Sequence, residues 1–314
     1  MSYDFKEVLI DGDLLVYACC SAAEYGNELV DVHFDKILES IDSKIVYIKN
    51  RVNAERVRVF FSGSNNFRFV VMPEYKANRE FVERPYYLTA AKAYATHKWD
   101  AEVVDCMEAD DLMCIYQDSK GGTTIIATID KDMMQCRGHH YRWETVHQGE
   151  KFTHVTGNGM LEIQHKVSGT TGKITKAVKG NGPLFLCWQL LVGDPTDGIL
   201  GCGIRETKIR KTGKNAGETY ETRIGVGAVG AYELLANCES YGQGIQVVRN
   251  EYRKLFGEAW EAEILKQGRC LYMVTRLVGN HYLQLWHHDT SKFNESLFDP
   301  TTKTFLIDQA TMAA

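Results

Sequence analysis

Short apolar runs alternate with helical patterns through the first half of the chain. The runs cover residues 8–10, 57–61, 102–106 and 123–129. Between them, apolar residues at helical spacing predict helices over about 31–50, 88–99 and 110–119. Strands that alternate with helices predict an α/β fold with a doubly wound parallel sheet. In such sheets, ligands bind beyond the carboxyl ends of the strands.

The pattern becomes helical in the second half of the chain. Apolar residues predict helices in 183–193, 228–236, 244–257 and 259–279. The connection from Lys151 to Gly182 is rich in Gly, Thr and Lys, and it predicts a hairpin or a mobile link. We therefore expect a sheet-based core, a helical region and a tail without an interpretable pattern, over 1–182, 183–290 and 291–314.

Composition places the chain among soluble globular proteins, with 44% hydrophobic and 25% charged residues. No apolar run approaches the roughly 20 residues that a membrane helix needs. The first residues also lack the pattern of a signal peptide, so we expect a cytoplasmic location without membrane contact. The nine cysteines form no C-x-x-C pair, which favours buried reduced thiols. Cys136, His139 and His140 lack a second half-site at zinc-finger spacing.

The charges are unevenly distributed. A net charge of -5 by itself argues against a nucleic-acid partner. However, no acid lies between Glu162 and Asp194, where the chain carries Lys166, Lys173, Lys176 and Lys179. From Arg205 to Arg223, six basic residues outnumber three glutamates. This separation is compatible with one site for metals and another for phosphates, and solvated lysine-rich loops explain each window equally well.

Eight acids directly follow apolar segments. They are Asp11, Glu108, Asp110, Asp111, Asp130, Asp132, Asp194 and Asp197. A doubly wound sheet would bring them to one edge, where unpaired carboxylates repel one another and lose hydration. Oxygen ligands without His or Cys fit Mg²⁺ or Mn²⁺ better than zinc, and this set needs about two ions. Each cluster alone is more often a helix N-terminus or a capped turn, so the prediction depends on the combination.

Six motifs follow one another along the chain. They are "LIDGDLLVY", "PEYKANR", "MEADDLM", "TIDKDMMQ", "GDPTDGILGCG" and "GVGAVGAYELL". In this order, over about residues 7–236, they resemble the phage 5' exonucleases of the flap endonuclease family, which are related to the 5' nuclease domain of bacterial DNA polymerase I. The resemblance implies a PIN-like nuclease core followed by a helical helix-hairpin-helix region that binds DNA.

The same resemblance implies a function in phage DNA replication or recombination. The chain would be a monomeric, metal-dependent 5'-to-3' exonuclease of the host-cell cytoplasm. Its substrate would be duplex DNA with 5' ends, nicks or flaps. Flap endonuclease activity and RNase H-type activity on RNA-DNA hybrids are further expectations.

Site roles carry over from the family motif by motif. Two Mg²⁺ ions, or Mn²⁺ in their place, would be held by Asp11, Glu108, Asp110 and Asp111 and by Asp130, Asp132, Asp194 and Asp197. The arch or gateway would cover about residues 63–100. Within it, Lys76 would reach the scissile phosphate, and Arg79 would help to offset the charge that develops there. Asp13 is expected to be a cap or a supporting residue.

Cations and aromatic residues alternate in "PEYKANREFVERPYY". Rings stack on bases and cations meet phosphates, so the pattern suits a single strand or a frayed duplex end. The alternative is an amphipathic loop that packs its tyrosines on the core. We expect DNA contacts from this part of the chain at Arg68, Tyr75 and Arg84.

A second DNA-binding surface is expected further along the chain. Its basic residues are Lys208, Arg210, Lys211 and Lys214. Gly225 and Gly227 would expose N–H groups at a helix start to a phosphate. "GVGAVG" also matches the dinucleotide fingerprint, but no clear strand precedes it in the sequence.

Two positions in the sequence depart from the family pattern. Gly63 stands where the family commonly has an acid, and Val229 stands where it has a lysine.

The sequence also leaves two other functions open. One rival is a phosphatase of the haloacid dehalogenase type, in which Asp11 would be the nucleophile. That mechanism leaves "EADD" and "DKD" unexplained. The other rival is a non-catalytic protein that binds DNA structures.

Overall fold

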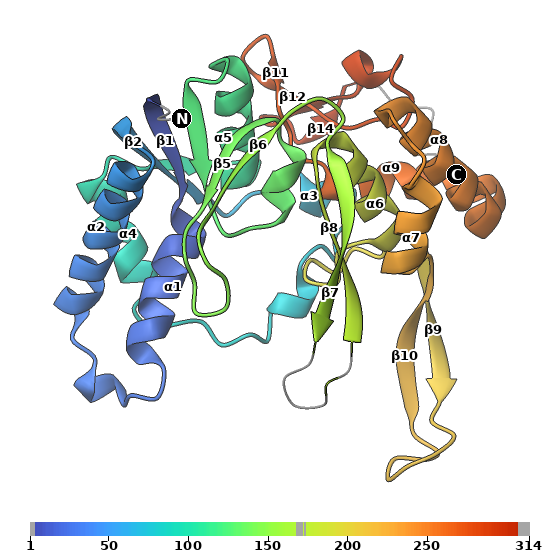
Figure 1. Cartoon of the computed structure of the whole chain (residues 1–314), viewed down its shortest axis with the longest axis horizontal. Helices are drawn as coiled ribbons and strands as arrows, with labels where there is room; N and C mark the ends of the chain where they lie inside the picture. Colours follow the sequence, from blue (N-terminus) through green and yellow to red (C-terminus); the bar gives the residue numbers. More distant parts are fainter. Residues whose placement is uncertain (1–3, 168–171, 173, 307–314) are drawn as a thin grey trace.

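The computed structural model describes residues 4–167, 172 and 174–306, and a six-stranded sheet forms its centre (Figure 1). The strand order is β3-β2-β1-β4-β5-β6. The strands are β1 (Phe5–Asp11), β2 (Ala54–Ser62), β3 (Glu102–Val104), β4 (Thr124–Ala127), β5 (Gly138–Arg142) and β6 (Lys151–Val155). All neighbours pair in parallel except β5 and β6. The predicted parallel sheet is confirmed, and β5 and β6 extend it.

Helices cover both faces of this sheet. They are α1 (Gly12–Glu24), α2 (Phe34–Arg51), α4 (Leu88–Lys98) and α5 (Ala109–Ser119). Successive residues of β1 point to opposite faces, so Val8 and Ile10 join one apolar core and Leu9 joins another. The first core holds residues of α1, α2 and α4, and the second holds residues of α5. The sheet is therefore doubly wound, as the alternating pattern predicts.

One expectation about the cysteines is wrong. Cys114 of α5 and Cys136, which precedes β5, form a disulfide with Cα atoms 6.1 Å apart. The two residues are 22 positions apart and lie on either side of β4. Only the packing of α5 against the sheet brings them together, so spacing along the chain does not reveal the pair. Because Cys136 is bonded in this way, it is not available for a zinc site.

The second half of the chain builds a helical layer around another apolar core. Its helices are α6 (Gly182–Val192), α7 (Ala228–Leu235), α8 (Tyr241–Phe256) and α9 (Trp260–Leu271). The helix predicted over 259–279 ends early, at Leu271. Beyond it the chain is extended, and the N–H groups of Met273 and Val274 bond to the side chains of Gln135 and Asp111. These contacts replace the hydrogen bonds that a continuing helix would make.

Two antiparallel hairpins project from the body in the same direction in Figure 1. One joins β7 (Met160–Val167) to β8 (Ile174–Asn181), and the other joins β9 (Gly203–Ile209) to β10 (Thr219–Gly225). The first accounts for most of the Gly-, Thr- and Lys-rich connection, although Lys173 lies outside the described residues. The second contains most of the basic insert.

The start of the expected tail is folded. A four-stranded sheet contains β11 (Leu277–Val278), β12 (Tyr282–Gln284), β13 (Leu297–Asp299) and β14 (Thr304–Phe305). Its Phe298 packs on Phe67, with ring centroids 6.0 Å apart. Residues 307–314 lie outside the described part. Across the described residues, no helix is both long and apolar enough to cross a membrane.

Candidate active site

The carboxyl end of β1 carries Asp11, which is the first acid of the site. Its carboxylate caps α1 by accepting from the Leu14 N–H at 3.0 Å, and it accepts from the Thr128 hydroxyl at 2.7 Å. Thr128 directly follows β4, which neighbours β1 in the sheet. Burial raises the pKa of Asp11 to about 7, because the charged form loses hydration. The carboxyl ends of the two strands thus meet at a buried acid.

Three further acids share this environment. Burial, with the charges of Asp11 and Asp130, raises the pKa of Asp110 well above its usual value. Burial also raises the pKa of Asp130, although its carboxylate accepts from the Asp132 N–H at 2.7 Å. Burial and the charge of Asp130 raise the pKa of Asp132 to about 9. The charge of Lys131 acts on Asp130 and Asp132, but it does not outweigh the burial and mutual repulsion of these carboxylates.

Asp194 lies next to this group, in the turn that follows α6. Its carboxylate accepts from the Thr196 N–H at 2.8 Å and lies 3.4 Å from the Lys131 ammonium. Burial opposes its ionisation, but a hydrogen bond from Asp132 and the Lys131 charge lower the pKa of Asp194. Asp132 and Asp194 thus shift in opposite directions, as expected for two carboxyl groups that share a proton.

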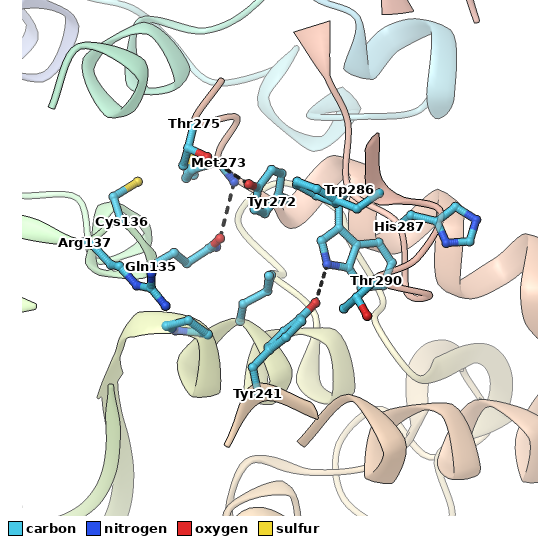
Figure 2. A pocket seen from close by; sticks show the side chains of 13 residues that line it. Gln135, Cys136, Arg137, Tyr241, Tyr272, Met273, Thr275, Trp286, His287 and Thr290 are labelled. Atoms are coloured by element: carbon cyan, nitrogen blue, oxygen red, sulfur yellow. Dashed lines mark hydrogen bonds between the residues drawn. The ribbon is translucent and has the colours of Figure 1, made fainter. Parts of the chain in front are cut away.

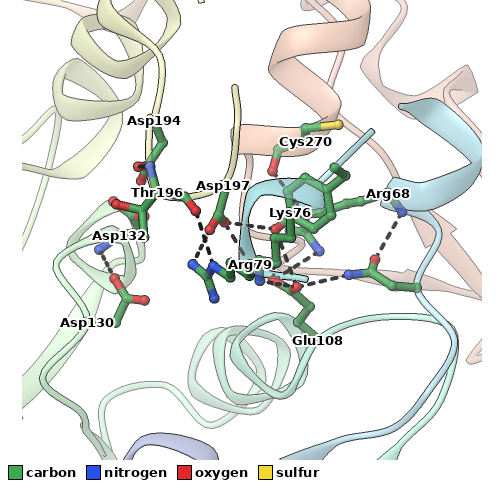
Figure 3. Close-up of polar contacts among 12 residues, drawn as sticks. Arg68, Lys76, Arg79, Glu108, Asp130, Asp132, Asp194, Thr196, Asp197 and Cys270 are labelled. Carbon is green, nitrogen blue, oxygen red and sulfur yellow. Dashed lines mark hydrogen bonds and ion pairs between the residues drawn. The ribbon is translucent and has the colours of Figure 1, made fainter. Parts of the chain in front are cut away.

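Lys76 lies beside two further acids, Glu108 and Asp197 (Figure 3). Its ammonium forms an ion pair with Glu108 and lies 3.7 Å from Asp197 Oδ2. Arg79 pairs with the other oxygen of Asp197 and donates to the Thr196 carbonyl at 3.1 Å. Burial opposes the ionisation of Glu108, but the charges of Arg68 and Lys76 lower its pKa. Lys76 and Arg79, which we expected to contact the reacting phosphate, therefore both lie beside acids of the site.

Asp111 and Arg68 do not take their expected places. Both side chains are fully buried, and the guanidinium donates to the two carboxylate oxygens at 2.6 and 2.8 Å. Asp111 also accepts from the N–H groups of Glu108 and Val274. Its oxygens are therefore engaged, and we remove Asp111 from the metal set. Arg68 is inaccessible to DNA, so that assignment is corrected as well.

Tyr75 is also placed differently from the expectation. Its ring is buried and cannot stack on a base, and its hydroxyl donates to Asp197 at 3.0 Å. In the same segment, Phe81 and Tyr86 are exposed, with 91% and 69% of their surface accessible. Arg84 is exposed beside them. The segment therefore packs one aromatic ring inward and presents others to solvent.

The basic insert is an exposed hairpin. Its four predicted phosphate contacts all point to solvent, namely Lys208, Arg210, Lys211 and Lys214. Arg223 differs, because its guanidinium donates to the carbonyls of Leu200, Leu191, Cys202 and Val226 at the hairpin base. That residue anchors the hairpin to the body.

The hairpin leads directly into α7. Gly225 has φ +151°, and a Cβ there would approach the Cys202 carbonyl to 2.2 Å, so only glycine fits. Gly227 is the N-cap of α7 and has open space around it. The preceding segment is the strand β10, which, among the residues that the structure describes, pairs with β9 alone and lies outside the central sheet. This is not the strand-to-helix unit that a dinucleotide site requires.

Close packing of the backbone explains why position 63 is a glycine. Its N–H donates to the Val104 carbonyl at 2.7 Å, and a Cβ would approach that oxygen to 2.6 Å. Asp13 supports this region, since its carboxylate accepts from the Ser62 N–H at 2.8 Å and pairs with Lys92 at 2.6 Å. Asp13 therefore holds β2 and α4 rather than capping a helix.

Three residues of the site were not singled out from the sequence. Thr128 and Lys131 both lie within the "TIDKDMMQ" motif, so their position next to the acids was a usable signal. Gln189 donates to Asp132 from α6, and nothing in the surrounding apolar helix marks it. In the described part of the chain, no three acidic, His or Cys side chains form a ready-made metal group. Lys76, Arg79 and Lys131 instead pair with several of the carboxylates.

Known proteins match this chain in sequence and in fold. Residues 6–163, half of the chain, match the family model described as 5'-3' exonuclease, N-terminal resolvase-like domain. An exodeoxyribonuclease of Enterobacteria phage T3 is 25% identical over 300 residues, covering 85% of this chain and 87% of that protein. The bacteriophage T5 flap endonuclease, solved with DNA and metal ions, aligns with a TM-score of 0.50. That alignment covers 83% of this chain and 88% of the other at 13% identity, which shows a shared fold.

Proposed function

The chain belongs to the 5'-3' exonuclease family, and from this premise we propose that it hydrolyses DNA phosphodiesters from 5' ends with two bound divalent metal ions. Membership makes it a nuclease enzyme with a PIN-like α/β core. The proposal adds the substrate, the direction of attack and the residues that act.

The buried acid cluster carries the proposal. Burial and mutual repulsion raise the pKa values of Asp11, Asp110, Asp130 and Asp132, and a bound cation would relieve both effects. The donors are all carboxylates, which suits Mg²⁺, with Mn²⁺ as a substitute. Such a pair of ions would stabilise the attacking and the leaving oxygen of the phosphodiester.

The acids divide between two ions as follows. The first ion would be held by Asp11, Glu108 and Asp110, and the second by Asp132, Asp194 and Asp197. Asp130 belongs between them, because its charge acts on Asp11 and Asp110 on one side and on Asp132 on the other. Asp111 has no part in either set.

Lys76 and Arg79 would bind the reacting phosphate. In the structure, their charges are matched by Glu108 and Asp197. Metal ions on those carboxylates would free both cations to face the non-bridging oxygens of the scissile phosphate. A donor held in place before the charge develops stabilises the transition state without reorganisation. The partial exposure of Lys76, at 24% of its side chain, supports access by the substrate.

The duplex would run from the acids along the β9–β10 hairpin. The four exposed cations of that hairpin and the N-terminus of α7 at Gly227 would meet backbone phosphates. Arg84 and the exposed rings near it would meet the strand that enters the site. The substrates would be 5' ends, nicks and flaps, and we keep action as a monomer in the host cytoplasm as a prediction.

The rival phosphatase assignment has less support. Its motif pairs Asp11 with a second acid two residues later, which would act beside the nucleophile. Asp13 occupies that position, but its carboxylate is held by Ser62 and Lys92. Formation of an aspartyl-phosphate at Asp11 without DNA cleavage would establish that rival.

The direct test compares 5'-labelled and 3'-labelled DNA in Mg²⁺ and in EDTA. The panel contains duplex, nicked, flapped and RNA-DNA hybrid substrates. The proposal expects short labelled products from the 5' label in Mg²⁺ and none in EDTA. Release from the 3' end, or binding without cleavage in Mg²⁺ and Mn²⁺, would contradict it. The hybrid substrate measures RNase H-type activity separately.

A further inference from the structure

Gln189 reaches Asp132 from inside the helical layer. It lies on α6, is only 1% exposed, and donates from Nε2 to Asp132 Oδ1 at 2.7 Å. We infer that Gln189 is a positioning residue that orients the Asp132 carboxylate for metal binding. The inference rests on the proposed function, because this orientation matters for catalysis only if Asp132 holds an ion.

A chain of hydrogen bonds fixes which end of the Gln189 amide faces the acid. The Met273 N–H donates to Gln135 Oε1 at 3.3 Å, as Figure 2 shows. The Gln135 amide nitrogen therefore faces the other way, and it donates to the Leu271 carbonyl and to Gln189 Oε1, each at 2.8 Å. Because its oxygen accepts from Gln135, Gln189 must turn its NH₂ group toward Asp132. A flipped amide would place two NH₂ groups against each other.

Gln135 makes its hydrogen bonds at the edge of a cavity. The cavity has a volume of about 260 Å³, with Leu186, Met273 and Trp286 among its walls (Figure 2). The bonds of Gln135 to the backbone at Leu271 and Met273 set its orientation, and through it the orientation of Gln189.

The same helix places two acids of the second metal site. Gln189 contacts Asp132, and α6 ends at Val192, just before Asp194. A ligand must present its lone pairs to the ion, and the partners that orient ligands typically contribute 10–100-fold to metal affinity or activity. The helix α6 therefore helps to set the distance between Asp132 and Asp194, because it contacts the first acid through Gln189 and leads directly into the second.

The test measures metal binding directly, without DNA. Mn²⁺ binding is followed by isothermal titration calorimetry for the wild type and for Gln189→Met, which keeps an unbranched side chain of similar length. The matched control is Gln117→Met, because Gln117 is also a buried glutamine that donates to a backbone carbonyl, toward the end of α5. Thermal melting of every variant in EDTA verifies folding.

We expect Gln189→Met to weaken Mn²⁺ binding at one site by about 10–100-fold in affinity. Gln135→Met should weaken it by a smaller factor, since Gln189 keeps its own amide. Gln117→Met should bind Mn²⁺ as the wild type does, even if its melting temperature falls. Wild-type affinity in Gln189→Met or Gln135→Met, or an equal loss in Gln117→Met, would overturn the inference. Wild-type protein that binds Mn²⁺ but cleaves no DNA would instead contradict the proposed function.

Discussion

Arg68 and Asp111 form a fully buried ion pair, joined by hydrogen bonds of 2.6 and 2.8 Å. Arg68 lies in the short helix α3 (Arg68–Val71), and Asp111 lies in the first turn of α5. Asp111 in turn accepts from the Glu108 N–H, so the pair also fixes the residue that meets Lys76. The structure thus ties the segment that leads to Lys76 to the helix that carries Asp110.

Loss of Arg68 should destabilise the protein strongly. Arg68→Met leaves the Asp111 carboxylate buried without its cation, which costs about 3–5 kcal/mol of unfolding free energy. Chemical denaturation at pH 7 measures the change. Arg84→Met is the matched control, because Arg84 is exposed and its loss should change stability by less than about 0.5 kcal/mol. A loss below about 1 kcal/mol for Arg68→Met would show that Asp111 has other compensation.

The β9–β10 hairpin should set the salt dependence of duplex binding. Changing Lys208, Arg210, Lys211 and Lys214 to Gln should lower the slope of log affinity against log salt by about 0.9 for each phosphate that the hairpin no longer neutralises. Fluorescence anisotropy with a labelled duplex in EDTA measures the slope. The control changes Lys98 and Lys120, two exposed lysines at the ends of α4 and α5. An unchanged slope in the hairpin variant would show that these four side chains do not contact DNA phosphates.

In the metal-free protein, Asp132 should lower the free energy of unfolding as the pH rises. Its pKa is raised to about 9 in the folded state, against about 3.9 in an unfolded chain. The folded state therefore binds more protons between these values, so this group removes stability as the pH rises from about 4 to 9. In EDTA, Asp132→Asn should melt higher than the wild type at pH 8 and close to it at pH 4. The reverse order would mean that Asp132 is ionised and stabilised without metal.

Lys76 should act on the rate of cleavage more than on binding. A lysine that only holds DNA contributes equally to ground and transition states, whereas one aimed at the scissile phosphate acts as charge develops. Lys76→Ala should therefore lower single-turnover cleavage at saturating DNA by about 100 to 1,000-fold. Its binding loss should be no more than a few-fold. Arg84→Ala should show the opposite pattern, and a wild-type rate for Lys76→Ala would make it a binding residue.

The sheet and the acid edge follow from local patterns. Apolar runs such as residues 57–61 give buried strands, and parallel topology then brings Asp11 and Asp130 to the same edge. The alternation of strands and helices is enough to predict this without knowing any contact. Lys76 lies beside Glu108 and Asp197, among the acids where the motif order led us to expect it.

The parts that could not be predicted depend on long-range contacts. Nothing in "FFSGSNNFR" shows that Arg68 will be buried against Asp111, because the two residues are 43 positions apart and meet only when α3 lies against the first turn of α5. Tyr75 is similar, since an aromatic ring beside cations fits both a DNA surface and a core. Gln189 lies in an apolar helix, where the sequence gives no reason to connect a single amide with an acid 57 positions away.

The most direct test of the central claim removes one acid from the second metal site. Asp132→Asn and Asp194→Asn are compared with the wild type in single-turnover cleavage of 5'-labelled duplex at saturating DNA and Mg²⁺, with binding measured in Ca²⁺. Asp13→Asn is the control, because the Asp13 carboxylate is held by Ser62 and Lys92 and is assigned to neither metal ion. We expect both cluster variants to bind DNA without detectable cleavage, while Asp13→Asn still cleaves. Near-wild-type cleavage by Asp132→Asn and Asp194→Asn would contradict the assignment of these acids to metal-dependent catalysis.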